Sequence, residues 1–260
     1  MKFFFLVALV LLPGLTHAAC PARALQTPDQ VNLAADSVLI VTHASTNYDP
    51  RFASKQGIDL ATHFASRQGI PMVYLQDDAA DQNYFTEECT PEYWVFSANG
   101  ELGFQVQSSH VYVSGGHLEQ CLFTTVNEVF FSWSGQDERD LTLTFLMDAI
   151  YSSGELVRED DDYYADFNSF MRVLSHGRAE EDAWPKITLL ETMGVIGQQK
   201  RAVEYLKRVL PNFENTLSPD YRVELYLNGA EVALLQDAPA WNSPVLKIRF
   251  VDSALKLKSI

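Results

Sequence analysis

Residues 108–131, SSHVYVSGGHLEQCLFTTVNEVFF, carry the strongest fold signal in the sequence. Residues 110–114 predict a buried strand, Gly115 and Gly116 predict a turn, and the residues that follow, to about 131, predict a helix. A glycine-rich turn between a strand and a helix lets backbone N–H groups approach a ligand and directs the positive end of the helix at it. Because Cys121 lies just inside this helix, the stretch predicts both a central strand–helix unit and a place where chemistry can occur.

The residues that precede this stretch predict a parallel sheet. Residues 37–42 and 71–75 are short apolar runs typical of strands buried on both faces, and the periodic residues 52–68 between them predict a helix. Residues 93–97 predict a further strand. Such alternation is typical of an open sheet with helices on both faces. We therefore predict an α/β fold whose mostly parallel, doubly wound (Rossmann-like) core spans about residues 37–131.

The residues after 137 predict a helical middle and then an antiparallel extension. Helical periodicity recurs four times, over residues 140–152, 163–176, 184–193 and 198–210. Residues 221–235 alternate with period two on either side of Asn228-Gly229, which is a type I′ turn signal. Residues 245–251 predict one more strand. Because no repeat or Pro/Ser-rich linker interrupts residues 20–260, we predict a single domain.

Residues 1–19 predict a secretory leader. Lys2 provides the positive start, residues 3–12 are apolar, and small residues precede Cys20 as a cleavage site. The apolar run is too short to span a bilayer, and no later stretch is apolar and long enough to be transmembrane. We therefore expect an exported protein, periplasmic or secreted. An uncleaved anchor and lipid attachment at Cys20 are the alternatives.

The net charge narrows the classes of partner, and the cysteine content indicates which disulfides can form. The formal net charge of −15 at pH 7 repels phosphate backbones, so we expect no nucleic-acid partner and leave open a small molecule or a protein. Export places Cys20, Cys89 and Cys121 in an oxidising compartment, where cysteines tend to form disulfides. Three cysteines leave one over, and both a Cys20–Cys89 and a Cys89–Cys121 disulfide fit the sequence.

Polar residues follow the predicted strands at their carboxyl ends, where doubly wound sheets bind ligands. These residues are His43, Asp77, Asp78, Ser97, Asn99, Gly115, Gly116 and His117. Two imidazoles and two carboxylates at one edge can ligate a divalent metal or serve as an acid–base set. Because no compact ligand motif such as H-E-x-x-H is present, we expect a ligand-binding crevice without a metal or cofactor.

Residues 115–125, GGHLEQCLFTT, resemble the isochorismatase-like cysteine hydrolases. The family pattern is close to G-x-x-x-[DE]-x-C-[VL]-x-x-T, and the matching residues are Gly115, Glu119, Cys121, Leu122 and Thr125. Residues 68–77 are also similar to the end of the family's first helix and to its second strand. The resemblance implies a shared fold over residues 37–131 and a nucleophilic Cys121, since a helix N-terminus lowers the pKa of a thiol.

Two residues of the family's catalytic triad have no counterpart here. The family has an aspartate at the end of its first strand, where this chain has Thr42-His43-Ala44-Ser45. It also has a lysine between that strand and the cysteine, whereas this chain has no lysine from Gln56 to Pro185.

These observations leave two functions open. The first is an exported protein that binds a ligand or partner in the crevice, without family-type catalysis. The alternative is a cysteine hydrolase in which Cys121 is the nucleophile and His43 or His117 is the base. In the hydrolase, backbone N–H groups between Gly116 and Cys121 would bind the oxyanion.

Overall fold

The computed structural model describes residues 25–33, 35–45, 48, 54–77, 85, 91–117, 120–134, 139–151, 221–238, 240–251 and 253–259. The predicted leader, the predicted helices after residue 152, and the residues Cys20, Asp78, Cys89 and Glu119 lie outside this part of the chain.

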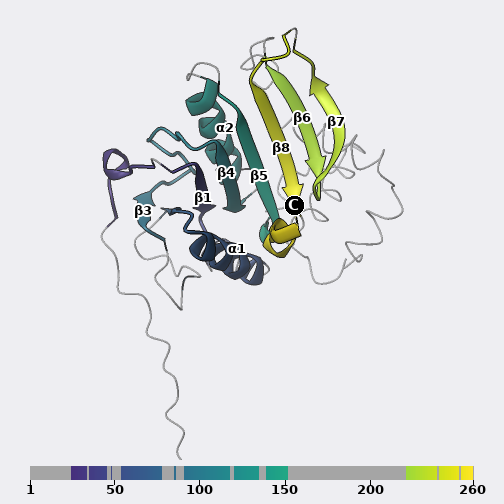
Figure 1. Ribbon diagram of the computed structural model, residues 1–260. Coiled ribbons are helices and arrows are strands. Elements are labelled where there is room, and N and C mark those ends of the chain that lie inside the picture. The colour runs from purple at the N-terminus through teal and green to yellow at the C-terminus, as the bar shows by residue number, and fades with distance from the viewer. Residues whose placement is uncertain are drawn as a thin grey trace, which may run out of the picture.

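One eight-stranded sheet, in the order β3-β2-β1-β4-β5-β8-β6-β7, organises the described residues (Figure 1). The strands are β1 (Ser37–Thr42), β2 (Met72–Gln76), β3 (Tyr93–Phe96), β4 (His110–Gly115), β5 (Leu141–Ile150), β6 (Arg222–Leu227), β7 (Ala230–Gln236) and β8 (Val245–Val251). All neighbouring strands are parallel except β6 and β7. The predicted mostly parallel α/β fold is therefore confirmed.

Helices cover both faces of the sheet, as predicted. Residues of β1 alternate between the two faces: Val38 and Ile40 pack in the cluster that contains Leu122 and Val126 of α2 (Cys121–Ser134). Leu39 and Val41 pack in the cluster that contains Ile58 and Ala61 of α1 (Lys55–Gln68). Short 3₁₀ helices, η1 (Pro28–Gln30) and η2 (Ala254–Ser259), complete the described elements. Neither α1 nor α2 is long and apolar enough to cross a membrane.

The helix predicted over residues 140–152 was wrong. These residues form β5, which pairs in parallel with β4 on one side and β8 on the other. Residues 141–147 are buried throughout, because β5 lies in the middle of the sheet with side chains packed on both faces. A strand buried on both faces shows no period-two alternation, and its apolar residues therefore also fit a helical period.

Two of the three C-terminal strands form an antiparallel hairpin, and the third pairs in parallel with its neighbours. β6 and β7 pair across Asn228 and Gly229, whose φ angles of 48° and 88° are those of a type I′ turn, so the predicted hairpin is confirmed. The antiparallel extension was predicted too broadly, since β8 and β6 continue the parallel sheet and only β7 is antiparallel. β8, the last strand in the chain, is inserted between β5 and β6.

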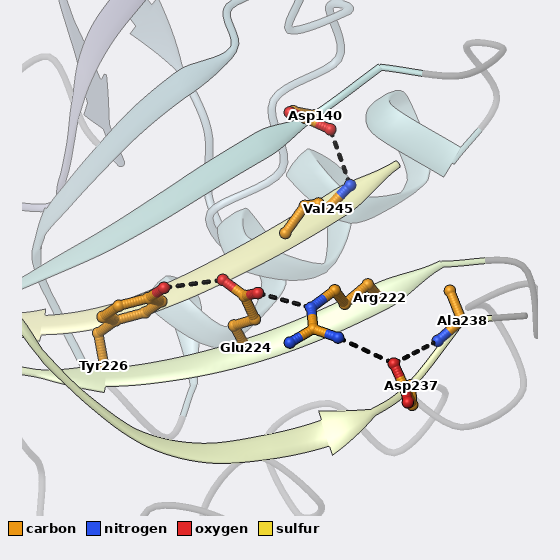
Figure 2. A network of polar contacts seen from close by, with 7 residues as sticks. All are labelled: Asp140, Arg222, Glu224, Tyr226, Asp237, Ala238 and Val245. Carbon is orange, nitrogen blue, oxygen red and sulfur yellow. Dashed lines mark hydrogen bonds and ion pairs between the residues drawn. The ribbon is translucent and has the colours of Figure 1, made fainter. Parts of the chain in front are cut away.

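Polar side chains on β6 connect it to the neighbouring chain segments (Figure 2). Nε of Arg222 and the hydroxyl of Tyr226 donate hydrogen bonds of 2.7 and 2.8 Å to the carboxylate of Glu224. Arg222 also pairs with Asp237, which follows β7. Glu224 is buried, so the two donors compensate a carboxylate removed from water.

Candidate active site

The carboxyl ends of β1, β2, β3 and β4 lie along one edge of the sheet, because these four strands are parallel neighbours. His43 follows β1, Asp77 follows β2, Asn99 lies just after β3, and His117 follows the two glycines after β4. Strand order therefore brings the sequence-predicted residues to a common edge, and the loop contacts determine which of them meet.

Tyr48 connects three of these residues. Its ring stacks on His43, with ring centroids 5.1 Å apart, and meets the ring of His117 edge-on at 5.9 Å. Its hydroxyl donates a hydrogen bond to Oδ2 of Asp77, and its carbonyl accepts one of 3.2 Å from Nε2 of His117. Sequence reasoning missed Tyr48, because it lies in the polar loop after β1, where no periodic pattern marks a contact residue.

His43 is buried and anchored to the backbone of two neighbouring segments. Its Nε2–H donates a 2.6 Å hydrogen bond to the carbonyl of Ser97, which follows β3. Its own carbonyl accepts a 2.6 Å hydrogen bond from the hydroxyl of Tyr151, which follows β5. These bonds fasten the loop after β1 to the ends of β3 and β5.

The two glycines allow close packing of the backbone at the end of β4. Gly115 has φ +90°, and a Cβ there would lie 1.9 Å from the carbonyl oxygen of Thr42. A Cβ on Gly116 would lie 2.6 Å from the carbonyl oxygen of Tyr151. The N–H of Gly116 donates a 3.0 Å hydrogen bond to the carbonyl of Thr42. This N–H is therefore engaged by β1 and is not open to a ligand, and the peptide bond that follows, Gly116–His117, is cis.

Cys121 is the first residue of α2 and carries a free, half-buried thiol. Burial raises the pKa of this thiol, and the negative charges of Asp77 and Glu101 raise it further. The backbone N–H groups of His117 and Cys121 itself act in the opposite direction and lower the pKa. The net effect differs from the lowering expected at a helix N-terminus, because burial and the two carboxylates outweigh the N–H groups.

The loop after β3 lies directly on the start of α2. A Cβ on Gly100 would be only 2.1 Å from the carbonyl oxygen of Cys121. The hydroxyl of Thr125, one turn along α2, donates a 2.8 Å hydrogen bond to the carbonyl of Gly100. The hydroxyl of Thr42, the last residue of β1, lies 3.0 Å from that of Thr125. These contacts fix the loop beside Cys121.

Asn99 holds the carboxylate of Glu101, a residue that sequence reasoning did not select. The side-chain amide of Asn99 donates a 3.0 Å hydrogen bond to Glu101, and its backbone N–H donates one of 3.1 Å. The side-chain bond is the main cause that lowers the pKa of Glu101. Both side chains are exposed. The structure thus supplies a second carboxylate near Cys121, in addition to Asp77.

In the part of the chain that the structure describes, no group of three or more His, Cys, Asp or Glu side chains is arranged to hold a metal ion. Asp78, predicted beside Asp77, lies outside that part. The Cys121 thiol is free, so the Cys89–Cys121 alternative is not formed. A Cys20–Cys89 disulfide involves two residues outside the described ranges.

No protein-family model matches the sequence, and no curated protein matches it either. Among solved structures, the chain is similar to N-carbamoylsarcosine amidase from Thermoplasma acidophilum, with 12% identity, 56% of this chain and 99% of that chain covered, and a TM-score of 0.37. It is similar to the MAR1 ribonuclease from Caenorhabditis elegans, with 13% identity, coverage of 64% and 91%, and a TM-score of 0.35. An isochorismatase family protein matches with 10% identity, coverage of 46% and 82%, and a TM-score of 0.32.

The matched structures thus include a protein of the family that residues 115–125 resemble. Because the TM-scores of these three structures are below 0.5, we transfer no residue role and no activity from them. The function is inferred from the contacts of this chain's own residues.

Proposed function

We propose that this chain is a cysteine hydrolase in which Cys121 is the nucleophile and Asp77 is the general base. The observation that carries the proposal is the placement of these two residues at one sheet edge: the free thiol begins α2, and Asp77 follows β2. Among the charged groups of the described residues, Asp77 acts most strongly on the thiol. A nucleophile whose own pKa is too high for spontaneous ionisation needs a neighbouring base, and a carboxylate fills that role.

His43 and His117 are assigned a positioning role in this proposal. Nε2–H of His43 is donated to the carbonyl of Ser97, and Nε2–H of His117 is donated to the carbonyl of Tyr48. His43 also stacks on the ring of Tyr48, so stacking from His43 and the hydrogen bond from His117 hold Tyr48, whose hydroxyl orients the carboxylate of Asp77. The resembled family has its aspartate at the end of the first strand. In this proposal Asp77, which follows the neighbouring strand β2, does the work of that aspartate.

The reaction we propose is acyl transfer to water. As the sulfur of Cys121 attacks the acyl carbon, the thiol proton passes to the carboxylate of Asp77. The bond to the leaving group then breaks, and the leaving group takes this proton. Water attacks the resulting thioester and loses a proton to Asp77. The acid is released, and the sulfur recovers the proton, so the thiol and the carboxylate are restored.

The thiolate that forms during the reaction is stabilised by the backbone. The N–H groups of His117 and Cys121 lower the pKa of the thiol, which means that they favour negative charge on the sulfur. This stabilisation depends on the turn after β4, which packs against Thr42 and Tyr151, and on the start of α2, which packs against Gly100.

Hydrolysis of p-nitrophenyl acetate, combined with peptide mass spectrometry, tests the proposal. We expect release of p-nitrophenolate and an acetyl group on Cys121. Cys121→Ala should abolish both, and Asp77→Asn should slow hydrolysis roughly 10²-fold, the usual contribution of a general base. Asp59→Asn on α1 is the matched control, because it removes an exposed carboxylate that pairs with Lys55 and should leave the rate unchanged.

Ligand binding without catalysis is the second candidate function, and the raised pKa of the Cys121 thiol favours it. Equal hydrolysis rates for the natural chain and Cys121→Ala, with no acetylated Cys121, would reject the hydrolase and leave binding alone.

We also propose that the protein is exported by cleavage of residues 1–19, on the basis of the leader pattern. N-terminal analysis of the protein recovered from its native host tests this. A chain that begins near Cys20 supports export, an acylated Cys20 supports a lipid anchor, and a chain that begins at Met1 contradicts cleavage.

A further inference from the structure

We propose that the Cys121 site selects substrates that carry a positively charged group, such as an amine or a guanidinium, and that Glu101 sets this preference. The inference extends the proposed hydrolase function, and the claim that the bound cation is a substrate rests on that function. Its physical content, a preference of the Cys121 environment for cations, is measurable without any hydrolysis.

Packing fixes Glu101 beside the nucleophile. The preceding residue, Gly100, lies so close to α2 that a Cβ would be 2.1 Å from the carbonyl oxygen of Cys121. The hydroxyl of Thr125 holds the carbonyl of Gly100 at 2.8 Å. The backbone of Leu102 is held as well, because its N–H donates a 2.5 Å hydrogen bond to the carboxylate of Glu128 on α2. Glu101 is therefore flanked on both sides by residues fastened to α2.

The charge of Glu101 is maintained and open to a ligand. Two donors of Asn99 hold its carboxylate, at 3.0 and 3.1 Å, and they favour the ionised form. The side chain is exposed, so a ligand can reach it. Asp77 places a second carboxylate at the same sheet edge, held by the hydroxyl of Tyr48.

None of the groups named above as acting on the Cys121 thiol, among the described residues, is a cation. The charged groups of the described residues that act on the thiol are the two carboxylates. A pair of like charges concentrates cations and repels anions, which raises the encounter rate of a cationic reagent.

Buried hydroxyls at the same edge provide an independent indication of a polar ligand. Ser97 follows β3, the strand that precedes Glu101, and Ser45 lies two residues after His43; both are at most 3% exposed. Neither hydroxyl has a hydrogen-bond partner among the described residues. Buried hydroxyls normally hydrogen-bond, so a donor-rich group such as an ammonium or guanidinium would satisfy them.

A bound cation would also assist the reaction. Asp77 and Glu101 oppose ionisation of Cys121, and a positive charge between them would cancel that opposition. Thiolate formation would then accompany substrate binding, so the thiol would remain protonated until a cationic substrate arrives.

Charge-selective modification of Cys121 tests the inference. The cationic reagent trimethylammonioethyl methanethiosulfonate and the anionic reagent sulfonatoethyl methanethiosulfonate are compared by the rate at which each modifies the Cys121 peptide, measured by mass spectrometry. The thiolate of Cys121 attacks either reagent and releases methanesulfinate, so the ratio of the two rates does not depend on the fraction of thiol that is ionised. We expect a cation-to-anion ratio about tenfold above that of mercaptoethanol.

Two variants and one matched control assign the preference to residues. Glu101→Gln should lower the ratio by roughly fivefold, and Asp77→Asn should lower it by a similar factor. Asp59→Asn removes the same charge from the exposed surface of α1 and should leave the ratio unchanged, which separates the site from the net charge of the chain. In the natural chain, the ratio should fall as salt is added, because salt screens the carboxylates.

The inference is overturned if the natural chain shows the same ratio as mercaptoethanol, prefers the anionic reagent, or reacts with neither reagent. It is also overturned if the ratio is insensitive to salt, or if Asp59→Asn lowers it as much as Glu101→Gln. Loss of ester hydrolysis alone, with the ratio as expected, would reject the hydrolase but keep the cation preference.

Discussion

The hydroxyl of Tyr151, just beyond β5, donates a 2.6 Å hydrogen bond to the backbone carbonyl of His43, just beyond β1. The ring of Tyr151 also meets that of His117 edge-on, with centroids 5.0 Å apart. A residue from the middle of the chain thus fixes both histidines of the candidate site, although β4 lies between β1 and β5 in the sheet.

Removing this hydroxyl should destabilise the fold. Tyr151→Phe removes one of two donors to the buried carbonyl of His43, which keeps the 2.8 Å hydrogen bond from the N–H of Ser45, and we expect the free energy of unfolding to fall by about 0.5–1.5 kcal/mol. Urea denaturation followed by circular dichroism measures the change. Tyr93→Phe is the control, because it removes an exposed hydrogen bond to the carbonyl of Asn32 and should cost less. Equal losses in the two variants would contradict the role assigned to Tyr151.

Alkylation of Cys121 by iodoacetamide should need a higher pH than alkylation of an ordinary cysteine. Burial, Asp77 and Glu101 raise the pKa of the thiol, and the thiolate is the reacting form. Rate–pH profiles measured at the Cys121 peptide should therefore have a midpoint above about 8.5, the usual thiol value.

Removal of either carboxylate should shift this midpoint to lower pH, because each negative charge opposes ionisation of the thiol. Asp77→Asn and Glu101→Gln test the two groups separately. A midpoint below the usual value in the natural chain, or an upward shift in the two variants, would refute this account of the electrostatics.

Glu224 should make stability depend on pH in the acid range. Burial opposes ionisation of its carboxylate, but hydrogen bonds from Arg222 and Tyr226 outweigh burial and lower its pKa. A lowered pKa means that the folded chain gains stability from this group above the unfolded pKa, and loses it as the pH falls through the folded pKa.

Glu224→Gln should therefore cost about 1–2 kcal/mol near neutral pH and much less in strong acid. Denaturant unfolding at several pH values measures this. Asp237→Asn, which removes an exposed partner of Arg222, should change stability by less than about 1 kcal/mol. A cost for Glu224→Gln that does not vary with pH would contradict the prediction.

Gly100→Ala should disturb the contact between the Glu101 loop and α2. Gly100 has φ +86°, and a Cβ there would lie 2.1 Å from the carbonyl oxygen of Cys121, so the loop must move. We expect a loss of about 2–4 kcal/mol in thermal or urea unfolding. Gly69→Ala is the control: φ is +64°, but a Cβ meets nothing within 4 Å, and the cost should be about 1 kcal/mol.

Local patterns in the sequence determined most of the parallel core. The apolar runs at residues 37–42 and 110–114 predict β1 and β4, and Gly69 marks the end of α1, where it adopts φ +64°. Asn228-Gly229 predicts the β6–β7 hairpin, because only a few residue types tolerate two successive positive φ values. Such signals are readable because burial on both faces and turn geometry act on neighbouring residues.

Only the tertiary structure decided the identity of β5 and the position of β8. The apolar residues 141–147 fit a helical period as well as a strand, and pairing with β4 and β8 selects the strand. Strand order is a property of the whole sheet, since β8 is inserted between strands that precede it in the chain.

In the candidate site, too, the sequence determined some of the residues and the tertiary structure decided the others. The sequence identified His43, Asp77, His117 and Cys121 from their places at strand ends and after the glycine turn. It gave no sign of Tyr48 or Glu101, because both lie in loops whose conformations depend on contacts with distant elements. The sequence by itself also suggested that the pKa of the Cys121 thiol is lowered at the start of a helix. The folded chain reverses that expectation, because burial and two carboxylates brought in from the ends of β2 and β3 oppose the charge on the sulfur.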